Sequence, residues 1–280
     1  MIVAVVGVGL IGGSLCLDLR QRGFAHYLIG VDSNSEHAEI ALQRGLVDCC
    51  RPLSKAVRQA DMVVLAVPVN HIITLLPEVL DLIDAETIVT DMGSTKQRIV
   101  QTIATHKLRR RFVAAHPMAG TEHSGPQAAM SGLFDHKVAI LCDDANSDQD
   151  ALYTVTRLFE TLQMQVICMN SDEHDIHAAY VSHISHITSF VLANTVLEKE
   201  KSASAIFDMA GGGFASTVRL AKSSPKMWSQ IFEQNANNIL PVLDTYIENL
   251  SRWRNDIENA NFAELEESMK QANDIRRILN

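Results

Sequence analysis

The sequence predicts a doubly wound α/β domain followed by an all-α domain. In the first part, short runs rich in β-branched residues alternate with helical segments, and a glycine-rich turn follows the first run. In the second part, apolar residues recur at helical spacings and no strand-like run is found. Strands that alternate with helices are typical of a mainly parallel sheet with helices on its faces. We therefore expect two domains, covering residues 1–170 and 171–280.

The composition is that of a globular protein with room for two domains. The chain has 280 residues, of which 47% are hydrophobic and 20% are charged, and it shows no repeat or low-complexity tract. Its net charge of −9 argues against a nucleic-acid-binding surface, which usually carries a basic face. The same charge repels anions, so an anionic ligand would need cations placed locally in its site.

The chain is expected to work in the cytoplasm, away from membranes. No apolar stretch reaches the roughly 18 residues of a membrane span. The apolar N-terminal run lacks a basic segment before it and is broken by four glycines, unlike a signal peptide. The five cysteines are an odd number without metal-like spacing, which fits reduced thiols. The adjacent Cys49 and Cys50 are interpreted as packing residues.

The first strand and the turn after it form a dinucleotide-binding motif. Residues 2–6 (IVAVV) are the strand, and the segment Gly7-Val8-Gly9-Leu10-Ile11-Gly12 leads into a helix. A GxGxxG pattern is informative when it lies between a strand and a helix. Gly7 permits the tight turn, Gly9 lets the backbone approach a pyrophosphate, and Gly12 lets the helix pack on the strand. The helix N-terminus then offers free N–H groups to the phosphates, as in a Rossmann-type domain.

The end of the second strand indicates which dinucleotide is bound. Residues 27–31 (YLIGV) form this strand, and Asp32 follows about 20 residues after Gly12. A carboxylate there accepts hydrogen bonds from the adenosine ribose hydroxyls and repels a 2′-phosphate. The alternative is that Asp32 only caps the strand end. Beside the glycines, Asp32 favours NAD over NADP as the cofactor.

Further strand ends carry turn-forming or polar residues. Strands are expected at 61–68, 86–94, 111–117, 137–143 and 165–169. In doubly wound sheets, ligands bind beyond the carboxyl ends of the strands. The residues at such ends are Ala66, Val67, Pro68, Gly93, Ser94, His116 and Pro117. We expect them to meet on one edge of the sheet, beside the bound NAD, although an ordinary polar loop is the alternative for the histidine.

The second domain is expected to begin with one long helix, from near Ser171 to about residue 200. This helix contains four histidines, His174, His177, His183 and His186. At about 100° per residue, the first two lie roughly opposite the last two, so one straight helix cannot bring all four to one metal ion. No metal is therefore expected. His183 and His186 share a face with Phe190 and are expected to point toward a buried region, as core or pocket residues.

The remaining helices carry an arginine and long apolar stripes. Three consecutive glycines in MAGGGF break the helical pattern, and Arg219 follows on a short helical stretch. A helix is expected to begin at Pro225, to kink at Pro241 and to end near Ile257. The last helix, 262–279, has an apolar stripe at three- and four-residue spacings. These stripes indicate a homodimer surface, or alternatively the core of the domain itself.

Several motifs, taken in order, resemble the prephenate/arogenate dehydrogenase family of tyrosine biosynthesis. They are HPMAGTEHSGP with LFDHK downstream, DEHD and SHISH in the long helix, AGGGF with the arginine after it, and SPKMW. The HPMAGTE stretch is highly specific, and the resemblance extends from the glycine-rich turn to Trp228. The chain resembles the minimal, single-activity form of the family, without a fused chorismate mutase segment or an added regulatory domain.

The resemblance implies an NAD-dependent oxidative decarboxylation of a small-molecule substrate. Hydride passes from the ring carbon that bears the hydroxyl group to the nicotinamide, the ring carboxylate leaves as carbon dioxide, and the ring becomes aromatic. By resemblance, His116 accepts the hydroxyl proton, and Ser94 orients the substrate or the nicotinamide. Histidine suits the first role because its usual pKa is about 6.5.

The same resemblance implies which residues hold the substrate. Arg219 matches the family's arginine for the substrate carboxylates, and a planar guanidinium suits a bidentate contact. The other matching positions are His183, His186, Glu122, Thr121 and Trp228, of which the tryptophan could equally be an ordinary core residue. Ser216 departs from the family, because many members carry an acidic residue three positions before the arginine.

Three alternatives stay open at this point. The substrate could be arogenate, although no extra acidic pocket group is evident and prephenate is favoured. The chain could be a β-hydroxyacid dehydrogenase or a pyrroline-carboxylate reductase, which join similar domains but are not expected to share HPMAGTE. It could also be an NAD-sensing module, which would need the glycines and Asp32 but neither His116 nor Arg219.

Overall fold

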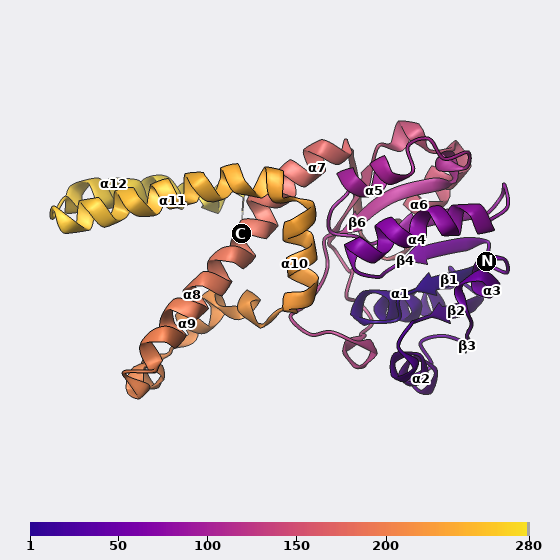
Figure 1. Ribbon diagram of the computed structural model, residues 1–280, viewed down its shortest axis with the longest axis horizontal. Helices are drawn as coiled ribbons and strands as arrows, with labels where there is room; N and C mark the ends of the chain where they lie inside the picture. The colour runs from indigo at the N-terminus through magenta and orange to yellow at the C-terminus, as the bar shows by residue number, and fades with distance from the viewer. Residues whose placement is uncertain (279–280) are drawn as a thin grey trace.

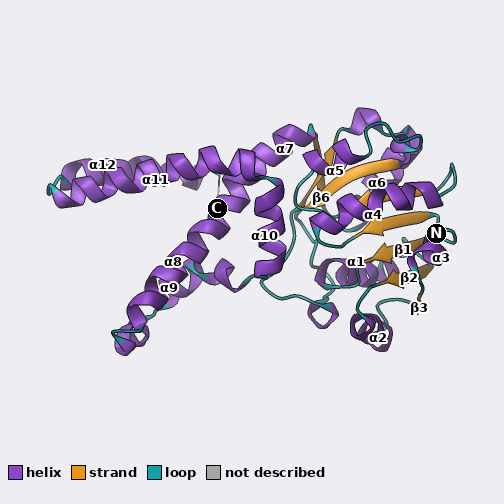
Figure 2. Cartoon of the chain, in the orientation of Figure 1, coloured by secondary structure: helices purple, strands orange, loops and turns teal. Residues whose placement is uncertain are grey.

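A computed structural model describes residues 1–278 as a sheet with its helices, followed by a part made of helices. Figure 1 shows two helical arms that diverge from the sheet, α8 (Ile184–Glu200) with α9 (Gly212–Thr217), and α11 (Ala236–Glu258) with α12 (Phe262–Ala272). All strands belong to the first part (Figure 2). The predicted doubly wound domain followed by an all-α domain is confirmed.

The sheet has eight strands in the order β3-β2-β1-β4-β5-β6-β7-β8. Their bounds are β1 Ile2–Val6, β2 Tyr27–Val31, β3 Cys49–Cys50, β4 Met62–Leu65, β5 Ile88–Asp91, β6 Phe112–Pro117, β7 Val138–Cys142 and β8 Gln165–Met169. The strands pair in parallel, except for β6 with β7. The strand order reverses at β1, and such a switch point opens a crevice at the carboxyl ends of the strands. We call the carboxyl ends of β1, β4, β5 and β6 the rim.

The antiparallel pairing of β6 with β7 follows from the connection between them. Within the described structure, residues 118–137 contain one short 3-10 turn, η2 (Pro126–Ala128), as their regular element. A parallel pair would need a crossover that returns to the opposite edge of the sheet, usually through a helix. The chain therefore leaves β6 at the rim, passes along it and enters β7 from the same edge of the sheet. Residues 118–137, the rim loop, consequently lie where a ligand would bind.

Helices cover both faces of the sheet and enclose a two-sided core. Those of the first part are α1 Leu10–Gln21, α2 Ser35–Gln43, α3 Leu53–Val57, α4 Val69–Leu82, α5 Gln97–Thr102 and α6 Gln149–Thr161. Val3 of β1 packs in one apolar cluster with Leu15 and Phe159. Its neighbour Ala4 packs in the other cluster with Ile72. Successive strand residues point to opposite faces, so this burial on both sides explains the nearly continuous apolar runs in the sequence.

The sequence did not predict β3, the strand at one edge of the sheet. It consists of Cys49 and Cys50 alone, which is too short for any alternating pattern. Both side chains are partly buried, and Cys50 packs against a core cluster, as the interpretation as packing residues requires.

The part after residue 170 contains helices throughout its described residues. In addition to the two arms, its elements are α7 Ser171–Ala178, the π-helical segment η4 Ala179–His183, the 3-10 segments η5 Ser204–Met209, η6 Arg219–Lys222 and η7 Asn273–Arg277, and α10 Pro225–Gln234. Pro241 lies inside α11, which continues as one helix on both sides of it. The last helix is shorter than predicted, since α12 ends at Ala272 and η7 follows it. Residue 279 of the predicted helix lies outside the described residues.

The π-helical segment changes which histidines share a face. A π turn holds about one residue more than an α turn, so the helix after it is rotated by about 100° relative to a straight α-helix. His174 and His183 are consequently both buried, each with 1% exposed area, whereas His177 is exposed. The prediction that His183 lies opposite His174 is wrong for this reason, whereas His174 and His177 both precede the π-helical segment, in α7.

The helical part has small cores and an extensive exposed apolar surface. One core contains Trp228 with Ile231, and the other contains Ile239 with Val242. Large apolar side chains are exposed along the two arms, at Val191, Leu197, Leu240, Ile247, Leu250, Ile257, Phe262 and Met269. Exposed apolar surface of this extent marks an interaction site. None of the described helices combines the length and the apolar character that a membrane span needs.

Candidate functional site

A cavity of about 490 Å³ lies between the rim and the helical part. We call it the rim cavity. The predicted site residues that line it are Gly9, Leu10, Ile11, Ala66, Val67, Pro68, Ser94, His116, Thr121, Glu122, His186, Arg219 and Trp228. They come from the glycine-rich turn, three strand ends, the rim loop, α8, η6 and α10. The structure therefore brings together residues that are spread over most of the chain.

The glycine-rich turn is fixed by backbone contacts that side chains would obstruct. Gly7 has a φ of +94°, and a Cβ on it would lie 2.5 Å from the carbonyl oxygen of Ala66. A Cβ on Gly12 would lie 1.9 Å from the carbonyl oxygen of Gly7. Beside Gly9, in contrast, a Cβ would meet nothing within 4 Å. The N-terminus of α1 thus borders open space at the rim, where an anionic group fits its N–H groups.

Asp32 is tied to the glycine-rich turn. Its Oδ2 accepts a hydrogen bond from the backbone N–H of Val8 at 3.1 Å, and its Oδ1 accepts one from Asn34 at 2.9 Å. His37 Nδ1 lies 3.8 Å from the same Oδ2. Gly7, Val8, Gly12 and Asp32 are absent from the described lining of the rim cavity. These four residues therefore shape the turn and the end of β2 beside the cavity.

His116 is the first member of a buried chain of hydrogen bonds. Its Nδ1 lies 2.8 Å from Nε2 of His174, and Nδ1 of His174 lies 2.7 Å from Oδ1 of Asp175. The carboxylate can only accept, so Nδ1 of His174 carries a hydrogen and donates it. In a neutral His174, Nε2 is then an acceptor, and Nδ1 of His116 must donate to it. This leaves Nε2 of His116 as a hydrogen-bond acceptor.

A buried ion pair lies behind His116. Lys96 and Asp91 are fully buried and paired, and the Lys96 ammonium also donates to the carbonyl oxygen of Ala115 at 2.6 Å. Burial lowers the pKa of His116 well below its usual 6.5, and the neighbouring His174, Lys96 and His183 lower it further. His116 is consequently neutral near pH 7, the form that can accept a proton.

Arg219 and Glu122 face one another across the domains. Nη1 of Arg219 lies 3.4 Å from Oε2 of Glu122, and Arg219 is the only lysine or arginine on the described wall of the rim cavity. A hydrogen bond from its own backbone N–H lowers the pKa of Glu122, and the Arg219 cation lowers it further. Arg219 therefore supplies a local cation in an acidic protein.

His186 and Trp228 form one wall of the rim cavity. Their rings stack with centroids 3.4 Å apart, and Nδ1 of His186 donates to the carbonyl oxygen of Ser182 at 3.1 Å. Burial is the main cause that lowers the pKa of His186, so the ring is neutral with Nε2 free to accept. Trp228 is 6% exposed, and its Nε1–H has no hydrogen-bond partner among the described residues. A buried N–H group without a partner is uncommon in folded proteins.

His183 occupies a different position from the one that the resemblance implies. It is buried, outside the described lining of the rim cavity, with Nδ1 3.1 Å from the side-chain nitrogen of Asn235. Its ring also meets the edge of Trp228 at a centroid distance of 5.9 Å. Burial lowers its pKa from 6.5 to about 4. His183 thus supports the wall from behind, because the π-helical segment turns it toward α10.

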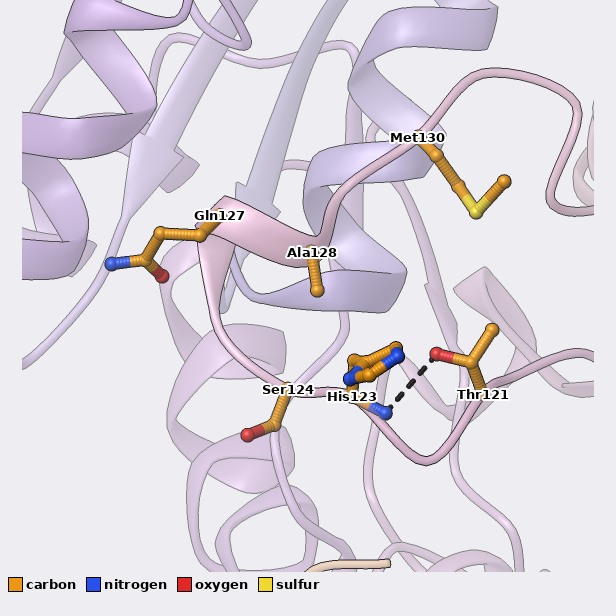
Figure 3. Close-up of a pocket in the computed structure, with 6 residues that line it drawn as sticks. All are labelled: Thr121, His123, Ser124, Gln127, Ala128 and Met130. Carbon is orange, nitrogen blue, oxygen red and sulfur yellow. Dashed lines mark hydrogen bonds between the residues drawn. The ribbon is translucent and has the colours of Figure 1, made fainter. Parts of the chain in front are cut away.

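A second cavity, of about 410 Å³, lies on the rim loop itself (Figure 3). It is lined by Thr121, His123, Ser124, Gln127, Ala128 and Met130. The backbone N–H of His123 donates to the Thr121 hydroxyl at 3.2 Å, as Figure 3 shows. Thr121, His123 and Ser124 line both cavities, so the two cavities are neighbours on the rim loop.

His174, Asp175 and Lys96 are members of the site that were not predicted from the sequence. His174 and Asp175 belong to the DEHD motif, which was used for the resemblance without a role for either residue. Lys96 follows Ser94 in the motif DMGSTK. Asp91 and Lys96, a pair of opposite charges beside a predicted buried strand, were the available signal for Lys96. A lysine is almost never fully buried unless it is paired.

Comparison with family models places both parts of the chain in one family. Residues 15–168 match the model described as prephenate dehydrogenase, nucleotide-binding domain, and residues 170–271 match prephenate dehydrogenase, dimerization domain. Prephenate dehydrogenase of Bacillus subtilis (strain 168) is 32% identical over 98% of this chain and 75% of its own length. Cyclohexadienyl dehydrogenase of Zymomonas mobilis is 30% identical over 99% of this chain and 95% of its own length.

Solved structures agree with this assignment. A structure of prephenate dehydrogenase from A. aeolicus, in complex with hydroxyphenyl propionate and NAD⁺, has a TM-score of 0.89 and 30% identity, over 100% of this chain and 98% of that one. Synechocystis arogenate dehydrogenase has a TM-score of 0.75 and 28% identity over 100% of both chains. A 3-hydroxyisobutyrate dehydrogenase, at 18% identity and a TM-score of 0.51, shares the fold alone. The chain belongs to the prephenate dehydrogenase family.

Proposed function

We propose that the protein is an NAD-dependent prephenate dehydrogenase, which converts prephenate to 4-hydroxyphenylpyruvate and carbon dioxide in tyrosine biosynthesis. One observation carries the proposal: His116 and Arg219 line the same cavity, the first with Nε2 as an acceptor and the second as its cation. The names of the relatives and the NAD⁺ complex of the A. aeolicus enzyme support it.

The cofactor is assigned to the glycine-rich turn and the rim. The open space beside Gly9 supports a pyrophosphate at the N-terminus of α1, and Asp32, at the end of β2, is proposed to accept hydrogen bonds from the adenosine ribose. When bound, NAD supplies the nicotinamide ring that accepts the hydride. The cofactor contacts proposed are Gly7, Val8, Gly9, Leu10, Ile11, Gly12, Asp32, Ala66, Val67, Pro68 and Ser94.

The chain's own residues handle the proton and the carboxylates. Nε2 of His116 accepts the proton of the ring hydroxyl as the hydride leaves the same ring carbon. When the bond to the ring carboxylate breaks, its electron pair enters the ring, and the proton returns to the oxygen to give a phenol. Arg219 binds a substrate carboxylate through its planar guanidinium. Ser94 orients the reacting groups, and Thr121, Glu122, His186 and Trp228 form the substrate-facing wall.

Arogenate is the second candidate substrate. Two relatives, the Zymomonas cyclohexadienyl dehydrogenase and the Synechocystis arogenate dehydrogenase, favour keeping it. Ser216, which replaces an acidic residue of many members, donates its hydroxyl to the carbonyl oxygen of Gly213 at 3.0 Å. An ammonium group on the substrate would therefore have only Glu122 as a carboxylate on the described cavity wall. This charge balance favours the keto acid prephenate.

One spectrophotometric experiment tests the function. Prephenate and arogenate are each supplied with NAD or NADP, and the absorbance of the reduced cofactor is followed. We expect the highest kcat/KM with prephenate and NAD. A preference for arogenate would establish the second candidate, and cofactor binding without turnover of either substrate would indicate an NAD-sensing module.

The proposal also covers the oligomeric state, the domain boundary and the cellular compartment of the protein. We infer a homodimer formed through the arms, because their apolar side chains are exposed and residues 170–271 match a model described as a dimerization domain. We infer a domain boundary at residue 170, because this residue lies between the last strand, β8, and the first helix of the second part, α7. Five free cysteines in the described structure fit a cytoplasmic protein.

A further inference from the structure

We propose that His174 and Asp175 are positioning residues that hold His116 in the tautomer able to accept a proton. His116 belongs to β6, whereas the other two residues lie in the first turns of α7, 58 positions along the chain. The inference rests on the proposed function, because it concerns how the proposed base is kept ready. The orientation of His116 would then depend on two residues of the helical domain, although no group of that domain takes up the proton itself.

The need for a tautomer lock comes from the imidazole ring. A neutral histidine carries its hydrogen on either Nδ1 or Nε2, and a partner on one nitrogen decides which. With His174 Nε2 as an acceptor at 2.8 Å, the hydrogen of His116 stays on Nδ1. Without this acceptor, the hydrogen can move to Nε2, and the ring then presents a donor to the cavity in place of an acceptor.

Asp175 is itself held from several sides. Its Oδ1 accepts from the backbone N–H of Lys96 at 2.8 Å, and its Oδ2 accepts from that of Gln97 at 3.0 Å. These N–H groups belong to the start of α5, whose own N-cap residue provides no side-chain cap in the described structure. The carbonyl oxygen of Asp175 also accepts from the Asn235 amide at 2.7 Å. Only an unprotonated carboxylate can accept from both α5 N–H groups and from His174. The donor direction of the hydrogen bonds from His116 through His174 to Asp175 is therefore fixed.

The charges around His116 make this carboxylate important after the proton arrives. The groups that face the ring are Lys96 with its partner Asp91, His174, and His183 behind it. The cation on Lys96 disfavours a second positive charge on His116, although Asp91 offsets much of it. Through His174, Asp175 provides the negative charge toward which a protonated His116 donates. The pair therefore orients the base and balances its charge.

Substitutions of the two residues test the proposal. His174→Phe removes the acceptor, and Asp175→Asn offers an N–H group toward His174, which reverses the hydrogen-bond direction. We expect both to lower kcat by about 10²-fold or more with KM for the substrate changed less than threefold, since the wrong tautomer disables a base. His174→Gln keeps an acceptor oxygen and should retain at least tenfold more activity than His174→Phe. The exposed His177→Gln and Asp172→Asn on the same helix are the matched controls.

A spectroscopic measurement separates positioning from simple loss of structure. In the protein labelled with ¹⁵N-histidine, the shifts of His116 should show a hydrogen on Nδ1 in the wild type and on Nε2 in Asp175→Asn. This measurement needs no turnover. It therefore tests the positioning role even if the wild-type protein is inactive on both substrates, a result that would refute the proposed function alone. Variants that keep kcat within threefold, or a His116 tautomer unchanged in Asp175→Asn, would overturn the inference.

Discussion

Arg219 of η6 lies 3.4 Å from Glu122 of the rim loop, and this contact joins the two domains at the rim cavity. The Arg219 side chain is 52% exposed and that of Glu122 is 24% exposed. An ion pair with this much solvent is worth about 0–1 kcal/mol. A substrate carboxylate can therefore compete for the guanidinium at little cost to the fold.

Arg219→Gln tests this contact. The variant should raise KM for prephenate by at least about tenfold, equivalent to about 1.4 kcal/mol, because it removes the cation of the cavity wall. Affinity for NAD, measured by calorimetry, should stay within about twofold. Lys107→Gln, with a side chain 73% exposed in the first domain, removes the same charge and controls for the overall field. An unchanged KM would place the carboxylate clamp elsewhere.

His116→Asn tests the base. Positioned acid–base groups contribute about 10²–10⁴-fold, so kcat should fall by at least 10²-fold while KM changes little. In the wild type, the active form is the neutral ring, and burial lowers the pKa of His116 well below 6.5. The rate should therefore be constant near neutral pH and decrease as the pH falls through this lowered pKa. If His116→Asn keeps that acidic limb, another group, such as His186, is the base.

Asp32→Ser tests the choice of cofactor. The carboxylate at the end of β2 repels a 2′-phosphate, so its loss should move the ratio of kcat/KM for NAD and NADP at least tenfold toward NADP. Glu36→Gln, a nearby substitution on α2, should leave the ratio unchanged. A wild-type enzyme that works better with NADP would show that Asp32 serves only the turn, through its bond to Val8.

Light scattering tests the homodimer. The wild type at micromolar concentration should have twice the chain mass of 30.9 kDa. Leu250→Glu, at a side chain 53% exposed on α11, should shift the mass toward that of one chain. Tyr153→Glu, at a side chain 64% exposed on α6, should leave the dimer intact. A monomeric wild type would show that the arms are not the dimer surface.

The site residues that could be predicted from local sequence patterns are those at the ends of strands. Gly7 and Asp32 directly follow strands, His116 lies near the end of one, and the carboxyl ends of neighbouring parallel strands must share an edge. Their position at one edge of the sheet could therefore be predicted once the strands were recognised. Arg219 and Trp228 needed the family resemblance, because no local pattern ties a helix in the second domain to a strand end in the first.

The rest depended on packing that local patterns do not encode. A single extra residue in the π-helical segment turned His183 away from the cavity wall, and the contact of His174 with His116 depends on where α7 lies relative to β6. The reversed direction of β7 came from a long connection without a crossover helix in the described structure. Both features are set by contacts between segments far apart in sequence, and their residues carry no signature in a window of a few positions.

Asp175 of the second domain caps α5 of the first domain, and this contact limits the exchange of either domain for that of another protein. A fragment that ended at residue 170 would expose the start of α5 and leave Nδ1 of His116 without its partner. In a chimera of this sheet with the helices of another protein, His116 would be oriented only if those helices provided an imidazole and a carboxylate at the positions of His174 and Asp175. The halves are thus poor modules for exchange. New substrate preferences in this chain are more accessible through single changes on the cavity wall than through domain shuffling.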